Sequence, residues 1–247
     1  MKEEKDPKRM RRVWKEALRK NPSNYELRVT VEYVPYLRLK AARILLSRTN
    51  TNYDLCVIAR YVPSLREKAW NLLLTRKVNS QELLYILTYV PSLRREAWQK
   101  LLEQEASNAD LRYVIKQIPS LKKKAAEKLL QRATCTNADL VCIIRHVPHL
   151  RKIAWEKLTL QRPSRGDLLN VIEFVPSLRR KAFSLLCQNP SNFHLRYIVR
   201  YVPSLREEAA KLLLTRHPTR EDLFYILQYV PALRKEATEK LRSLPSY

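Results

Sequence analysis

Apolar residues recur along this chain at helical spacing, in short blocks that alternate with prolines. Leu111, Val114, Ile115 and Ile118 lie three or four positions apart, so they share one face of a helix of about three turns. A second apolar block follows each proline, with Leu at the second residue after it, Ala at the sixth and usually Leu at the ninth and tenth. The pattern predicts an all-α chain built from pairs of short amphipathic helices.

The prolines recur at a nearly constant interval of 27 to 29 residues, always after Val or Ile, at Pro35, Pro63, Pro91, Pro119, Pro148, Pro176, Pro203 and Pro231. Similar text surrounds each one, from TNYDLCVIARYVPSLREKAWNLLL to TREDLFYILQYVPALRKEATEKL. We therefore predict a right-handed α-solenoid of eight two-helix repeats over residues 22–247, stabilised by the interfaces between neighbouring repeats. Residues 1–21 are predicted to be a basic N-terminal segment with a capping helix.

Local signals predict where the helices begin and end. A capping residue followed three positions later by a carboxylate opens the first helix in seven copies: Ser23–Glu26, Thr51–Asp54, Asn79–Glu82, Ser107–Asp110, Thr136–Asp139, Ser164–Asp167 and Thr219–Asp222. The seventh repeat departs from this pattern, with Ser191 and His194. Val-Pro predicts a tight corner, because the residue before a proline avoids the α region and proline suits the first turn of the next helix.

One position of the second helix is alanine in every copy, which predicts close approach of helix backbones there: Ala41, Ala69, Ala97, Ala125, Ala154, Ala182, Ala209 and Ala237. The next residue is Trp70, Trp98, Trp155 or Phe183 in four copies, and we expect these rings to pack in the core.

The second half of each repeat, as in VPSLRREAWQKLL, resembles the second helix of HEAT-type repeats in its order of basic residue, alanine and leucine. The resemblance covers residues 22–244, although repeats of about 28 residues are shorter than typical HEAT repeats. It implies a superhelical scaffold with a concave binding face, and it implies no particular partner.

The net charge narrows the choice of partner. The chain has 48 Lys and Arg against 24 Asp and Glu, a formal charge of +24, which calls for an anionic partner such as nucleic acid, a membrane surface or an acidic protein. Membrane binding is not expected, because the apolar helix faces are committed to the core. The four cysteines lack the dense pairing of a small secreted domain, the N-terminus is charged, and the chain has no long apolar run. We therefore predict an intracellular protein, cytoplasmic or nuclear, with no signal peptide or membrane span.

The third residue after each proline is always basic: Arg38, Arg66, Arg94, Lys122, Arg151, Arg179, Arg206 and Arg234. A cation in the first turn of a helix opposes the helix dipole by about 0.3–1 kcal/mol, so another interaction must hold it there. Two interpretations stay open. These cations pair with the capping carboxylates in a ladder, as HEAT-type repeats often do, or they form a row of phosphate ligands.

Further basic residues recur at fixed helical positions and form stripes, which is what a polyanion requires. They follow the first set on the second helices, and they also occur on the first helices: Arg95, Lys123, Lys124, Lys152 and Arg180, then Arg60, Lys116, Arg145 and Arg200. The alternative is a charged face that only contacts water.

Aromatic residues form another row at the position two residues before the proline in six of the eight copies, where the fourth and fifth copies have Gln117 and His146: Tyr33, Tyr61, Tyr89, Phe174, Tyr201 and Tyr229. Others stand four residues earlier: Tyr85, Tyr113, Tyr197 and Tyr225. Interleaved with arginines, these rings could stack on the bases of a single strand. They could equally pack between helices with their hydroxyls at the surface.

Together these features predict a non-enzymatic scaffold that contacts a nucleic-acid backbone through its Arg and Lys stripes, and the tyrosines favour single-stranded RNA or DNA. The alternative is a protein-interaction scaffold, or a subunit of a larger complex, that binds an acidic partner. A remote alternative is a HEAT-like DNA glycosylase, which would need a lone carboxylate and aromatics in a cleft that breaks the repeat. No catalytic, cofactor or metal site is predicted, since Pro148 separates His146 from His149. The oligomeric state is left open.

Overall fold

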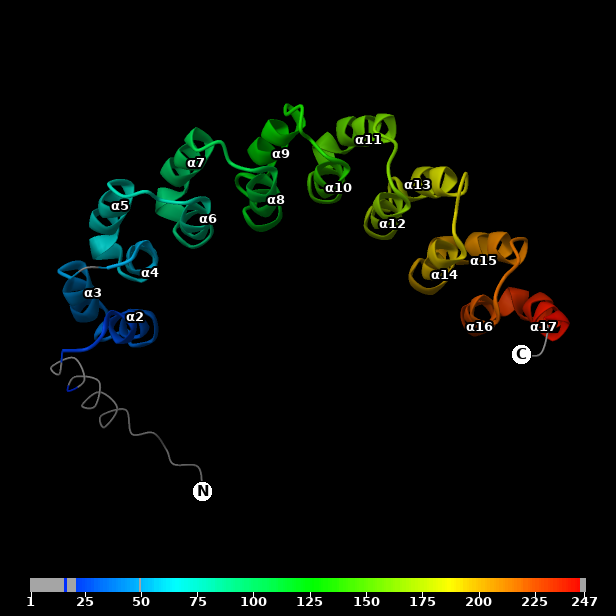
Figure 1. Ribbon diagram of the computed structural model, residues 1–247, viewed down its shortest axis with the longest axis horizontal. Helices are drawn as coiled ribbons and strands as arrows, with labels where there is room; N and C mark the ends of the chain where they lie inside the picture. Colours follow the sequence, from blue (N-terminus) through cyan, green and yellow to red (C-terminus); the bar gives the residue numbers. More distant parts are fainter. Residues whose placement is uncertain (1–15, 17–20, 49, 245–247) are drawn as a thin grey trace, which may run out of the picture. The chain divides into compact units, whose positions relative to one another are not determined.

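The computed structural model describes residues 16, 21–48 and 50–244, and all regular structure within them is helical. Sixteen α-helices alternate as the first and second helices of eight hairpins in these described residues, with five short 3₁₀ helices at the corners (Figure 1). The predicted all-α fold of two-helix repeats is confirmed. The capping helix predicted within residues 1–21 lies outside the described residues, apart from Glu16 and Asn21.

The helices have nearly uniform lengths. The first helices are α2 (Asn24–Tyr33), α4 (Asn52–Tyr61), α6 (Ser80–Tyr89), α8 (Asn108–Gln117), α10 (Asn137–His146), α12 (Arg165–Phe174), α14 (Asn192–Tyr201) and α16 (Arg220–Tyr229). The second helices are α3 (Arg38–Leu46), α5 (Arg66–Leu74), α7 (Arg94–Glu103), α9 (Lys122–Leu130), α11 (Arg151–Leu160), α13 (Arg179–Leu186), α15 (Arg206–Leu214) and α17 (Arg234–Ser243). The 3₁₀ helices are η1 (Pro63–Leu65), η2 (Pro91–Leu93), η3 (Pro148–Leu150), η4 (Pro203–Leu205) and η5 (Pro231–Leu233).

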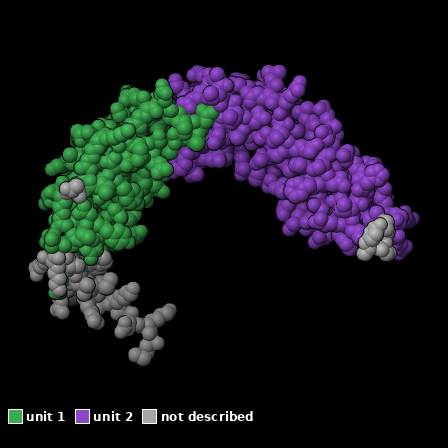
Figure 2. Space-filling view, in the orientation of Figure 1, with its two compact units in different colours: residues 1–110 green, residues 111–247 purple. Residues whose placement is uncertain are grey.

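The chain divides into two compact units, residues 1–110 and residues 111–247 (Figure 2). Within each unit the first helices lie along one side and the second helices along the other (Figure 1). Neighbouring first helices pack directly on one another, α2 on α4 on α6 in one unit and α10 on α12 on α14 on α16 in the other. Neighbouring second helices contact each other much less. This difference in spacing makes the first helices the concave side of each unit.

The core lies between the two helix layers. The eight alanines predicted to sit at close helix approaches are fully buried, and the predicted core rings of Trp70, Trp98, Trp155 and Phe183 are 3–9% exposed. The prediction that the rings pack in the core is confirmed. Because the alanines are fully buried, a larger side chain at these positions would disturb the packing of the two layers.

The caps and corners follow the sequence signals closely. Reciprocal capping bonds form at all seven predicted pairs, as between Thr51 and Asp54, whereas in α14 the Ser191 hydroxyl contacts Nδ1 of His194. At the corners the valine leaves the helical region, with φ near −123° and ψ near 84° at Val62. The proline then opens a tight turn, and the second helix begins three residues later, at the basic residue. The second helix therefore starts later than the proline signal alone predicts.

Candidate nucleic-acid interface

The arginines that lie three residues after the prolines donate hydrogen bonds to backbone carbonyls at the helix corners. Nε of Arg66 donates a hydrogen bond, 2.8 Å long, to the carbonyl oxygen of Ala59. In a continuous helix that carbonyl would accept from the N–H of residue 63, but residue 63 is proline and has no N–H. The same bond to the residue seven positions back is made by the other arginines of this row: Arg38, Arg94, Arg151, Arg179, Arg206 and Arg234. Each of these side chains supplies the donor that the proline lacks.

This arrangement corrects the ladder expected for these cations. Their Nε atoms bond to backbone carbonyls at the carboxyl end of a first helix, where a positive charge is favourable. In Arg66, Arg151 and Arg179 an outer nitrogen also reaches a serine of the next repeat, as in the bond of 3.0 Å from Nη1 of Arg179 to Oγ of Ser204. Lys122 occupies the same position in the fourth repeat and has no planar guanidinium to bridge two groups. The proposed phosphate contacts of this row stay a prediction.

A charged ladder does exist, and different arginines make it. On the first helices, Arg28 pairs with Asp54 at 2.9 Å, Arg112 with Asp139, and Arg196 with Asp222 at 3.3 Å. Each carboxylate belongs to the next repeat, caps its own helix and is at most 1% exposed. These arginines show no periodic signal in the sequence, because only some repeats have a cation at this position.

The remaining predicted cations fall on two different layers. Arg95, Lys123, Lys124, Lys152 and Arg180 lie near the start of second helices and are exposed. The other predicted set lies near the end of first helices, at Arg60, Lys116, Arg145 and Arg200. The two sets belong to different helix layers, so the structure divides the predicted binding residues into two groups.

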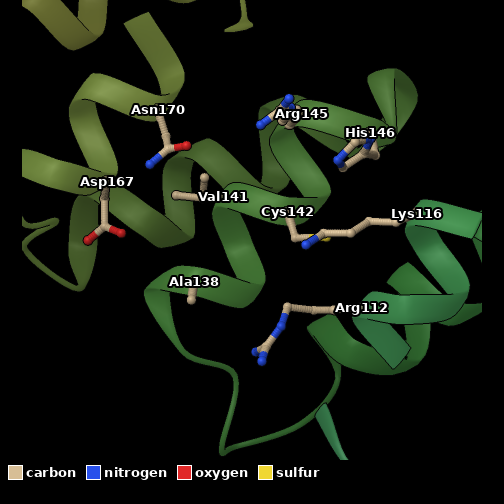
Figure 3. A pocket seen from close by; sticks show the side chains of 9 residues that line it. All are labelled: Arg112, Lys116, Ala138, Val141, Cys142, Arg145, His146, Asp167 and Asn170. Carbon is tan, nitrogen blue, oxygen red and sulfur yellow. The ribbon is translucent and has the colours of Figure 1, made fainter. Parts of the chain in front are cut away.

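Two of the first-helix cations, Lys116 and Arg145, line one pocket of about 270 Å³, here called the basic pocket. Figure 3 shows Arg112 and Lys116 projecting from α8, Arg145 and His146 at the end of α10, and residues of α12 across from them. The full lining is Arg112, Lys116, Ala138, Val141, Cys142, Arg145, His146, Asp167 and Asn170. All nine residues belong to the unit of residues 111–247.

The basic pocket has more positive than negative charge. Within the described residues no ion pair joins Lys116 or Arg145 to a carboxylate. The one carboxylate in the lining, Asp167, accepts capping bonds from N and Oγ of Ser164 at 2.9 and 2.7 Å. Asn170 adds a neutral polar group opposite the cations (Figure 3). The pocket is therefore suited to an anion.

The titratable groups in the pocket respond to this environment. Burial lowers the pKa of His146 below its ordinary value, and the positive charges of Arg145, Lys122 and Lys116 lower it further. Burial raises the pKa of the Cys142 thiol, even though the nearby cations oppose that shift. The thiol therefore stays neutral, which argues against a role as a nucleophile.

Arginines and tyrosines form a cluster on the first helices of the unit of residues 1–110, here called the α4–α6 cluster. The Arg60 guanidinium lies 3.8 Å from the ring centroid of Tyr89, and its Nη1 donates to the hydroxyl of Tyr85 at 3.2 Å. Burial raises the pKa of Tyr85 to about 12, so its hydroxyl stays protonated at neutral pH. Tyr53 completes the cluster with its ring edge against Tyr85, at 5.8 Å between centroids.

The same arrangement recurs in the other unit, between α14 and α16. Nη1 of Arg200 donates to the hydroxyl of Tyr225 at 3.4 Å, and the guanidinium lies 4.9 Å from the ring centroid of Tyr201. These residues line a second pocket of about 300 Å³, here called the α14–α16 pocket: Phe193, Arg196, Tyr197, Arg200, Tyr201, Glu221 and Tyr225.

Exposed aromatic rings gather on the first helices. Among the described residues, rings that are 37–70% exposed occur on the first helices at Tyr25, Tyr33, Tyr53, Tyr89, Tyr113, Phe174, Phe193, Tyr201 and Phe224, and at the first corner at Tyr36. Others in the predicted row are half-buried against arginines, as Tyr61 and Tyr85 are. Part of the row therefore packs against neighbouring side chains, and stacking of the exposed rings on bases stays a prediction.

A carboxylate beside aromatic rings, which the glycosylase alternative requires, occurs at Glu221 in the α14–α16 pocket. Its Oε2 pairs with Nη1 of Arg196 at 2.5 Å, and its side chain is 66% exposed. The carboxylate therefore lies among aromatic rings but is held by an arginine of the preceding first helix.

Comparisons with models of protein families, with curated proteins and with solved structures found no match to this chain. The HEAT-type resemblance therefore rests on the repeat text alone. None of the helices in the described residues is both long enough and apolar enough to cross a membrane.

Proposed function

We propose that this chain is a non-enzymatic repeat protein that binds single-stranded nucleic acid along the first helices of its repeats. The observation that carries the proposal is the basic pocket, where Lys116 and Arg145 line the cavity beside Arg112 and Asp167 is committed to a helix cap. Arg112 is itself paired with Asp139, so Lys116 and Arg145 supply the pocket's unpaired charge. Phosphate contacts from arginine and lysine supply most of the affinity of such proteins and fix the register of the strand.

The aromatic residues support a single strand over a duplex. Unpaired bases can stack on exposed rings such as Phe174, which lies beside the basic pocket with the Arg145 guanidinium 3.5 Å from its ring centroid. Bases paired within a duplex are not available for such stacking. Alternating cations and exposed rings on one helix layer therefore match a strand with phosphates and free bases.

The second-helix cations have a different role in this proposal. Arg95, Lys123, Lys124, Lys152 and Arg180 belong to the other layer, so a strand lying on the first helices does not contact them. They raise the long-range attraction for any polyanion, which increases the rate of association without adding specific contacts.

Fluorescence anisotropy of the full chain with labelled single-stranded RNA, single-stranded DNA and duplex DNA tests the proposal. We expect tighter binding of the single strands, with affinity that falls steeply as salt rises from about 50 to 300 mM. Binding no tighter than that of a polylysine control at about 150 mM salt would contradict the proposal. Tighter binding of polyglutamate than of either single strand would favour the protein-partner alternative.

A further inference from the structure

The α14–α16 pocket is lined by four aromatic rings and three charged side chains. Its side chains lie on successive turns of α14, from Phe193 to Tyr201, with Glu221 and Tyr225 of α16 on the other side. The volume of about 300 Å³ lies at the lower end of the range for small-molecule sites. Mostly aromatic walls with few polar groups are typical of such sites.

Hydrogen bonds hold the aromatic walls in place before any ligand binds. The Tyr197 hydroxyl donates to Oε2 of Glu173 at 2.6 Å, and this bond raises the pKa of Tyr197 to about 12. Its ring packs on Tyr201 with 4.6 Å between centroids, while Arg200 ties Tyr225 to α14. Phe193 is still 60% exposed and Tyr201 48% exposed, so both present ring surface for stacking.

The charged residues indicate which ring the pocket prefers. The guanidinium groups of Arg196 and Arg200 disfavour a cationic ligand such as a methylated amine. Glu221 lines the pocket, is held by its ion pair with Arg196, and has oxygens that accept hydrogen bonds. Among nucleobases, guanine presents two adjacent N–H donors on its Watson–Crick edge, which match the two oxygens of a carboxylate.

The α4–α6 cluster provides an internal comparison five repeats earlier. It keeps the equivalent aromatic and arginine positions, with Tyr53, Arg60 and Tyr85 in place of Phe193, Arg200 and Tyr225. It lacks the ion pair, because Cys56 and Gln81 stand where α14 and α16 have Arg196 and Glu221. Shared stacking residues with a carboxylate at only one of the two sites indicate that the second site adds selectivity.

We infer that the α14–α16 pocket binds one unpaired nucleobase of the strand, with guanine preferred because it can donate to Glu221. This inference rests on the proposed function and adds the base class that this part of the surface recognises. Stacking on Phe193 and Tyr201 would supply affinity for any base, and Glu221 would supply the discrimination.

The test compares short oligouridine strands that carry one guanosine, one adenosine, one cytidine or one abasic site at the same position. We expect the guanosine strand to bind most tightly and the abasic strand about tenfold more weakly. In E221Q the advantage of guanosine over adenosine should disappear while the salt dependence of binding stays. The matched variant Q81E, at the equivalent position of the α4–α6 cluster, checks whether a carboxylate alone confers preference.

Different failures have different meanings. Equal binding of the guanosine and abasic strands, together with a steep salt dependence, would overturn this inference and leave the proposed function standing. A guanosine preference that is unchanged in E221Q would also overturn it. No binding of any strand above the polycation control would overturn the proposed function and this inference together.

Discussion

Arg179 provides the sharpest test of how this repeat is held together. Its Nε donates to the carbonyl oxygen of Ile172 at 2.7 Å, Nη2 to the carbonyl oxygen of Glu173 at 3.2 Å, and Nη1 to Oγ of Ser204 at 3.0 Å. Hydrogen bonds from charged donors contribute about 1.5–3 kcal/mol, and an orphaned buried carbonyl costs about 1–3 kcal/mol. We therefore expect R179A to lower the free energy of unfolding by about 2–3 kcal/mol, with R179K in between because lysine keeps the charge and loses the planar fork.

The neighbouring residue is a matched control, since the Arg180 side chain is 82% exposed and its contact with Glu208 is 3.7 Å long. R180A should change the free energy of unfolding by no more than about 0.5 kcal/mol. Urea denaturation followed by circular dichroism measures both variants, with an unchanged slope m showing that the same surface unfolds. Equal losses in R179A and R180A would refute the role assigned to the corner arginines.

Three further outcomes follow from the same structure. K122R should raise the urea midpoint by the equivalent of about 0.5–1.5 kcal/mol, because a guanidinium can donate to the Ile115 carbonyl, for which Pro119 has no N–H donor. A lower midpoint in K122R would contradict this. Anion binding should raise the depressed pKa of His146, so strand affinity should increase as pH falls below about 6.5. H146Q should abolish that increase without lowering affinity at about pH 8. Burial alone would raise the pKa of Asp139, but the capping bonds from Thr136 and the Arg112 guanidinium outweigh burial and lower it. The charged carboxylate therefore stabilises the fold above about pH 4, and this contribution is lost in acid. D139N should cost more stability at neutral pH than at about pH 3, and an equal cost at both pH values would contradict the assignment.

The fold could be predicted from the sequence because the same local signals for helix starts, corners and packing recur along the eight repeats. The Val-Pro corners, the capping pairs and the alanines depend on backbone sterics and hydrogen bonding over a few residues, and those rules are local. The hydrogen bonds that the corner arginines donate to backbone carbonyls could also have been predicted from the sequence. Proline removes the N–H that a carbonyl four residues back requires, and Arg66 lies three residues after Pro63.

The site was less predictable because it depends on which residues of neighbouring repeats meet. Arg112 lies at a helix position that is cysteine in the second repeat and leucine in the third, so a search for invariant cations overlooks it. The partition of cations between the two helix layers also depends on how the hairpins stack. Glu221 carried no signal in the sequence, since its importance comes from Arg196 on the preceding first helix.

The most direct test of the central claim compares two double variants that remove the same charge from different layers. K116Q/R145Q alters the basic pocket on the first helices, and K123Q/K124Q alters the exposed start of α9. For a labelled single strand, we predict that the first variant binds more weakly, with a slope of log affinity against log salt smaller by about 1.4, as expected for two lost phosphate contacts. The second variant should keep nearly the full slope. Equal losses of affinity and slope in the two variants would contradict the claim that the strand lies on the first helices.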